Sequence, residues 1–155
     1  MEEPDFTDPE KWLNGEFVWE AKSYYFISFM CIFGKPRKLF EAVQQLKAEI
    51  GSKGYIIPDE AMLLMETKLF SGRLYLEINR PENYDASVSE IEKSKVYSTV
   101  HRGPMKTIAE TARTIKESIT AKKGVPPTAT YYWDFRHGPD LTGQRGDRIV
   151  IFCRV

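Results

Sequence analysis

The chain contains one pattern twice, and this repetition limits the folds that it can adopt. Each copy begins with a run typical of a β-strand, SYYFISFMCIF or KVYSTVHR, and reaches a helix-starting proline, Pro36 or Pro104. An amphipathic stretch follows, with apolar side chains at i, i+4, i+7 and i+11. The spacing predicts helices near residues 36–53 and 104–123, each ending at a Lys-Gly pair. The apolar side chains are Leu39, Val43, Leu46 and Ile50 in the first copy and Ile108, Ala112, Ile115 and Ile119 in the second.

The similarity continues after each predicted helix. Pro58 and Pro126 are each followed eight residues later by a carboxylate, Glu66 and Asp134, in or at the end of a β-like run. A glycine-rich turn and a final β-like run, RLYLEI or RIVIFC, complete each copy. A duplicated strand–helix–strand–strand unit predicts an α+β fold, because paired amphipathic elements must bury their apolar faces. We expect an antiparallel sheet with two helices on one face and a ligand groove between the repeats.

The repeats also predict how the chain is divided. Residues 1–20 carry seven acidic side chains and one lysine, and we interpret them as a leader whose aromatic side chains pack on the domain. The domain itself covers residues 21–155. Within it, repeat one covers about 21–80, a polar linker 81–93, and repeat two about 94–155.

The composition argues against several classes of function. The 22 basic residues balance the 22 acidic ones, so no charge excess favours nucleic acid binding by this chain alone. Cys31 and Cys153 lie in apolar runs, as buried reduced thiols do, and two histidines are too few for a structural metal. We therefore predict no metal and no cofactor. The acidic N-terminus is unlike a signal peptide and no apolar run is long enough to span a membrane, which predicts a cytoplasmic protein without a membrane partner. The oligomeric state stays open.

Strand alternation separates the residues into two faces of the predicted sheet. Around residue 132 the odd-numbered positions are all aromatic and suit the helix-covered core, which leaves Tyr132 and Asp134 for the groove. Aromatic walls attract flat and cationic ligands, and a carboxylate among them selects positive charge or acts as a general base. The candidate ligand-binding residues are Asp134, Tyr132, Glu66, Tyr25, Phe29, Tyr75, Glu77, Tyr97, His101 and Arg136.

Simpler interpretations of these residues stay open. Glu66 precedes Lys68 and also suits a solvated surface pair. Asp134, near the end of its strand, also suits a cap for the glycine-rich turn, and His101 also suits a structural role. Tyrosines on a sheet commonly contribute packing alone.

Short motifs resemble the GyrI-like small-molecule-binding domains, which include effector domains of multidrug-sensing transcription activators and stand-alone proteins. The segment VHRGP is similar to the family's H-x-G-P-Y turn, with Met105 in place of the tyrosine. The segment YYWDF is similar to its H-E-I-Y strand, with Asp134 at the glutamate and Arg136 at the tyrosine. The closing DRIVIFCRV resembles its last strand. The resemblance covers about residues 20–155 and implies that Asp134 lies in a ligand groove.

The leading hypothesis is a binding module for amphipathic, aromatic or cationic small molecules, acting as a sequestering or sensing protein. The alternative is a hydrolase that opens cyclopropane-type electrophiles with Asp134 or Glu66 as general base, an activity that the resemblance implies for some stand-alone members. The chain has no match for the tryptophan pair of that branch, since it reads AMLLMETKLF there. A protein-interaction domain is the second alternative.

Overall fold

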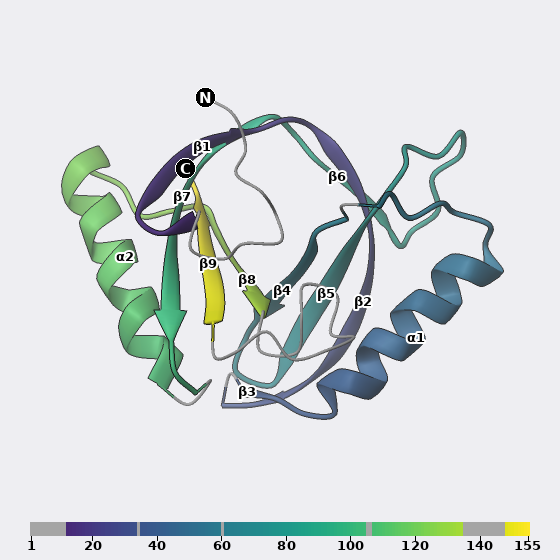
Figure 1. The fold of residues 1–155 in the computed structure, drawn as a ribbon, viewed down its shortest axis with the longest axis horizontal. Helices are drawn as coiled ribbons and strands as arrows, with labels where there is room; N and C mark the ends of the chain where they lie inside the picture. Colours follow the sequence, from purple (N-terminus) through teal and green to yellow (C-terminus); the bar gives the residue numbers. More distant parts are fainter. Residues whose placement is uncertain (1–11, 34, 60, 105–106, 135–147) are drawn as a thin grey trace. The chain divides into compact units, whose positions relative to one another are not determined.

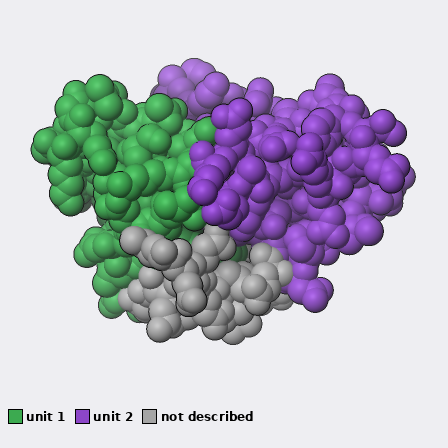
Figure 2. All heavy atoms as spheres, turned by 90° about the horizontal axis from the view of Figure 1, so that it is seen from above, with its two compact units in different colours: residues 1–19, 94–155 green, residues 20–93 purple. Residues whose placement is uncertain are grey.

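The computed structural model of the chain is an α+β fold, and it describes residues 12–33, 35–59, 61–104, 107–134 and 148–155 (Figure 1). The chain divides into two compact units (Figure 2). Unit 1 comprises residues 1–19 and 94–155, and unit 2 comprises residues 20–93. Within each unit the strand pairs of the described residues are antiparallel, as the sequence predicts.

Unit 2 is a sheet covered on one face by a helix. Its elements are β2 (Lys22–Ile32), β3 (Lys35–Pro36), α1 (Leu39–Ser52), β4 (Leu63–Thr67), β5 (Ser71–Ile78) and β6 (Val88–Ile91). The strands pair in the order β4-β5-β2, and β3 and β6 pair with the other edge of β2. Helix α1 packs on β2 and β5 and buries Val43, Leu46 and Ile50. Residues 81–93, which the sequence predicts as a polar linker, contain the strand β6.

Unit 1 has the same arrangement around α2. Its elements are β1 (Gly15–Trp19), β7 (Ser94–Arg102), α2 (Ile108–Lys123), β8 (Ala129–Asp134) and β9 (Arg148–Arg154). The strands pair in the order β1-β7-β9-β8, and α2 packs on β7 and β9. In both units the long strand before the helix, β2 or β7, pairs with the second strand after the helix, β5 or β9, which in turn pairs with the first strand after the helix, β4 or β8. An additional strand, β6 or β1, pairs with the free edge of the first.

Both predicted helices are confirmed, although each begins a few residues later than the prolines suggest. Pro36 pairs with Cys31 across β2 and β3, so the chain is still extended there. Lys38, the residue before α1, has a left-handed backbone with a φ of 53°. Helix α2 ends as predicted at Gly124, which has a φ of 78° and donates its N–H to the carbonyl of Thr120 at 2.8 Å. Glycine suits this position because it lacks the Cβ that a left-handed backbone disfavours.

Candidate ligand-binding site

Each helix covers one face of its own strands, so each unit has a helix-covered face and a helix-free face. Sequence alternation groups residues by face but does not show which group the helix covers. In unit 1 the structure reverses the prediction for β8. Tyr132, predicted for an open groove, packs with Ile119 of α2 and Ile151 of β9 on the helix-covered face. Tyr97 belongs to the same cluster.

His101 also lies on the helix-covered face, where it has a structural role. The ring is buried, with Nδ1 2.7 Å from Thr111 Oγ1 and Nε2 3.0 Å from the carbonyl oxygen of Pro104. Because a carbonyl can only accept, Nε2 donates its hydrogen there, and in the neutral ring Nδ1 then accepts from the Thr111 hydroxyl. His101 thereby ties the end of β7 to the start of α2, and both of its nitrogens are occupied.

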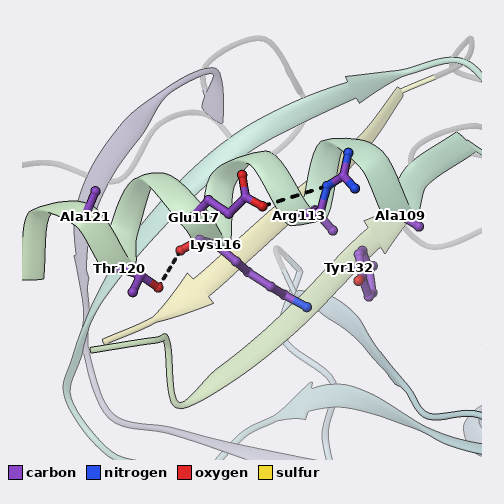
Figure 3. Close-up of a pocket in the computed structure, with 8 residues that line it drawn as sticks. Ala109, Arg113, Lys116, Glu117, Thr120, Ala121 and Tyr132 are labelled. Carbon is purple, nitrogen blue, oxygen red and sulfur yellow. Dashed lines mark hydrogen bonds and ion pairs between the residues drawn. The ribbon is translucent and has the colours of Figure 1, made fainter. Parts of the chain in front are cut away.

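A crevice of about 670 Å³ runs along α2 beside Tyr132. Lys116 extends from the helix toward the strand that carries Tyr132 (Figure 3). Burial raises the pKa of the Tyr132 hydroxyl. Arg113 lies 3.9 Å from Glu117, whereas Lys116 has no acidic partner among the described residues. The uncompensated charge of this crevice is thus positive, which disfavours a cationic ligand.

The helix-free face of unit 1 is a closed aromatic cluster. The rings of Trp12 and Trp19 each lie 4.9 Å from the ring of Phe152 at its centre. Tyr131 and Trp133, predicted for the helix-covered core, contact this cluster instead. The rings are 0–6% exposed, so the cluster is packed core rather than an open site. The indole N–H groups of Trp12 and Trp19 are buried and have no hydrogen-bond partner among the described residues.

The helix-free face of unit 2 combines an acid with aromatic rings, of which Phe26 is half-buried while Tyr24 and Tyr75 are buried. Tyr75 donates its hydroxyl to Glu66 Oε1 at 2.7 Å. The Tyr75 ring lies 5.7 Å from that of Phe26, and the Arg73 guanidinium lies 4.8 Å from the Phe26 ring centre. Glu66 and Arg73 are paired across β4 and β5, but no ion pair joins their side chains. Glu66 is half-buried and has no basic partner among the described residues. Because Arg73 lies over the Phe26 ring and forms no ion pair with Glu66, the half-buried Glu66 carboxylate can bind a positively charged group of a ligand.

Glu77, the second acid on this face, is paired with a cation. Glu77 Oε1 lies 3.8 Å from Lys22 Nζ and accepts the N–H of Met62 at 3.2 Å. Tyr24, which the sequence prediction omitted, contacts the Tyr75 ring at 6.3 Å. Glu66 is therefore the acid of this face that forms no ion pair among the described residues, and its cross-strand neighbour Arg73 lies over the Phe26 ring instead.

The remaining predicted residues lie elsewhere. Tyr25 is on the helix-covered face, where its hydroxyl donates to Glu49 of α1 at 3.0 Å. Phe29 shares that face by alternation and lies over Gly72. Asp134 is the last residue of β8 and is paired with Ile149, but its side chain lies outside the described part. Arg136 lies outside the described residues altogether.

The sequence contained only part of the signal for this face. Phe26 was missed because SYYFISF places aromatic residues on both faces of β2, and alternation alone ranks neither face above the other. Arg73 was missed because it lies in β5, where only Tyr75 and Glu77 were considered. The described residues contain no group of three side chains able to hold a metal ion.

No helix among the described residues is long and apolar enough to cross a membrane. Both cysteines are free and buried, and burial raises the pKa of each thiol.

No protein-family model and no curated protein matches the sequence, but solved structures match its fold. The crystal structure of the EcmrR C-terminal domain has a TM-score of 0.60 and 12% identity, and the match covers 90% of this chain and 94% of that one. EcmrR in a cryo-EM structure of its DNA complex has a TM-score of 0.65 and 11% identity over 90% of this chain and 55% of that one. SAV2435 bound to tetraphenylphosphonium has a TM-score of 0.51 and 12% identity over 92% and 93%. These likenesses confirm, at the level of the fold, the resemblance to GyrI-like domains.

Proposed function

We propose that the protein binds amphipathic small molecules that combine aromatic groups with a positive charge, as a sequestering or sensing protein. The proposed site is the helix-free face of unit 2, with Glu66 as its acid and Tyr75, Phe26 and Tyr24 as its aromatic wall. The observation that carries the proposal is the Glu66 carboxylate, which accepts the Tyr75 hydroxyl and has no basic partner among the described residues. SAV2435, which has the same fold, binds an aromatic cation, and this supports the class of ligand.

The chemistry of the face favours such a ligand over neutral or anionic ones. The Tyr75 hydroxyl donates to Glu66 Oε1 and orients the carboxylate. The other carboxylate oxygen, Glu66 Oε2, has no hydrogen-bond partner among the described residues. A desolvated cation gains from both the carboxylate and the negative faces of nearby rings. An anion would instead meet the carboxylates of Glu66 and Glu77, while the cations of this face are engaged, Lys22 with Glu77 and Arg73 with the Phe26 ring.

Calorimetric titration with tetraphenylphosphonium tests the proposal. Glu66→Gln keeps the shape and the acceptor for Tyr75 but removes the charge. We expect binding to weaken by about 1–3 kcal/mol, or about five- to 150-fold in Kd. Glu77→Gln is the matched control on the same face, and it should have a smaller effect because Lys22 already balances that charge.

A neutral ligand separates charge from shape. Triphenylphosphine oxide carries similar rings without the positive charge, so Glu66→Gln should leave its affinity unchanged. Equal weakening of both ligands, or none, would show that Glu66 is not the acid that selects the cation. In that case Asp134→Asn is the informative variant, because the resemblance to GyrI-like domains points to Asp134. Selective loss of the cation in that variant would move the site to β8.

A further inference from the structure

Two neighbouring turns of unit 2 expose large apolar side chains to solvent. At the end of β2, Met30 is 64% exposed and Phe33 is 72% exposed. In the turn between β4 and β5, Leu69 is 55% exposed and Phe70 is 64% exposed. Side chains of this size are normally buried, and a group of them on the surface marks an interaction site.

The two turns form one continuous surface. The N–H of Cys31 donates to the carbonyl of Phe70 at 3.2 Å, and the rings of Phe33 and Phe70 lie 5.9 Å apart. In Figure 1 the turn between β4 and β5 lies beside β3. Phe33 has a φ of 49°, a left-handed backbone that is uncommon for an aromatic residue. We name the surface the hairpin-tip patch, and its members are Met30, Ile32, Phe33, Leu69 and Phe70.

The patch is bordered by positive charge alone in the segments that form it. Residues 30–38 and 67–72 contain four basic residues and no acidic one, although the whole chain has equal numbers of each. Of these, Arg37, Lys38 and Lys68 are exposed. The surface thus pairs apolar tips with cations, the combination that anionic phospholipid surfaces recognise.

We propose that the hairpin-tip patch docks the protein on an anionic phospholipid surface. Apolar side chains at the tips of two turns can enter the boundary between headgroups and acyl chains without unfolding either turn. The exposed lysines and arginine reach the lipid phosphates while their aliphatic stems lie along the apolar surface. The absence of a spanning helix among the described residues bears on crossing a membrane, not on lying at its surface. The proposal is independent of ligand binding at Glu66.

Co-sedimentation with vesicles tests the docking. Vesicles of equal parts phosphatidylcholine and phosphatidylglycerol should bind the protein, and phosphatidylcholine alone should bind it more weakly. Added salt should weaken the first interaction, because exposed charges are screened. Phe33→Ser with Phe70→Ser should lower the partition coefficient about ten-fold or more, and Lys68→Gln about five-fold.

Two matched variants control for general effects of lost apolar surface or charge. Ile56→Ser removes an apolar side chain that is 64% exposed, and Arg80→Gln removes an exposed cation. Both lie near the end of β5 remote from the patch, since the N–H of Asn79 donates to the carbonyl of Ile56. Neither should change vesicle binding. The double serine variant should keep its urea midpoint, because the phenylalanines are exposed.

Three outcomes would overturn the proposal. These are no binding to the anionic vesicles, equal losses in the patch and control variants, and a concentration-dependent dimer that the double serine variant abolishes without any vesicle binding. The last result would assign the patch to contact between copies of the chain.

Discussion

Replacing Gly72 by alanine is the sharpest test of how β4, β5 and β2 are packed around Glu66. Gly72 lies between Thr67 of β4 and Phe29 of β2 in the sheet. A Cβ at this position would lie 2.7 Å from the carbonyl oxygen of Glu66 and 2.7 Å from the Phe29 ring. Contacts this short force a shift, and the carbonyl belongs to the backbone of the strand that carries the proposed acid.

The expected cost follows from these contacts. The Phe29 ring can rotate or shift, but the Glu66 carbonyl cannot move without disturbing β4. Inserting a methyl group into a filled site costs about 1–3 kcal/mol. For a chain of this size each kcal/mol corresponds to roughly 2–4 °C in Tm, so we expect Gly72→Ala to lower Tm by roughly 2–12 °C.

Urea denaturation measures the change as a lower midpoint with an unchanged m-value. Gly51→Ala is the matched control, because a Cβ at Gly51 meets nothing within 4 Å on the surface of α1. It should stabilise the protein by about 0.5–1 kcal/mol, since glycine is unfavourable inside a helix. If Gly72→Ala proved as stable as the natural chain, the close approach of the Glu66 carbonyl to Gly72 would be wrong.

Three further outcomes are expected. Lys53 donates to Asp85 at 2.7 Å and holds the Asp85 pKa below its usual range, a stabilisation present above about pH 4 and lost as pH falls through the lowered pKa. Asp85→Asn should therefore lower the urea midpoint at neutral pH and flatten its fall toward acid. His101→Ala should cost about 1–3 kcal/mol in urea while leaving tetraphenylphosphonium affinity unchanged, because the ring is structural. Cys31 and Cys153 should react with iodoacetamide slowly in the native protein and quickly after unfolding, because burial raises both thiol pKa values.

Periodicity predicts the helices of this fold well because their burial follows from the sequence spacing. Val43, Leu46 and Ile50 are buried in α1, and Ala112 and Ile119 in α2, as the matched stripes require. The strand β6 was hidden because an edge strand pairs through its backbone and needs little apolar alternation. Its Ser89 and Glu90 pair with Tyr24 and Ser23 while reading as polar linker.

The site was harder to predict because strand alternation shows which residues share a face of the sheet but not which of the two faces the helix covers. The predicted grouping of residues by face was correct for β4 and β5. Glu66 lies on the same face as Tyr75, which it contacts, and Leu63 and Met65 lie on the other face. The grouping for β8 was also correct, but the aromatic side chains that it placed under the helix pack with Trp12 and Trp19 instead. Those tryptophans come from the chain before β7, and no local pattern in β8 reports their position.

The proposed ligand acid lies in the same hairpin as Leu69 and Phe70 of the hairpin-tip patch. Glu66 precedes Phe70 by four residues, so their Cα atoms are at most about 14 Å apart even in a fully extended chain. Amphipathic cations concentrate at anionic membranes for the same reasons that would hold the patch there, namely apolar burial and attraction to phosphate. A protein docked through Phe33 and Phe70 would therefore hold Glu66 within reach of the layer where such ligands are most abundant. Each proposal can fail alone, because vesicle binding depends on the tips and selectivity for the cation depends on the carboxylate.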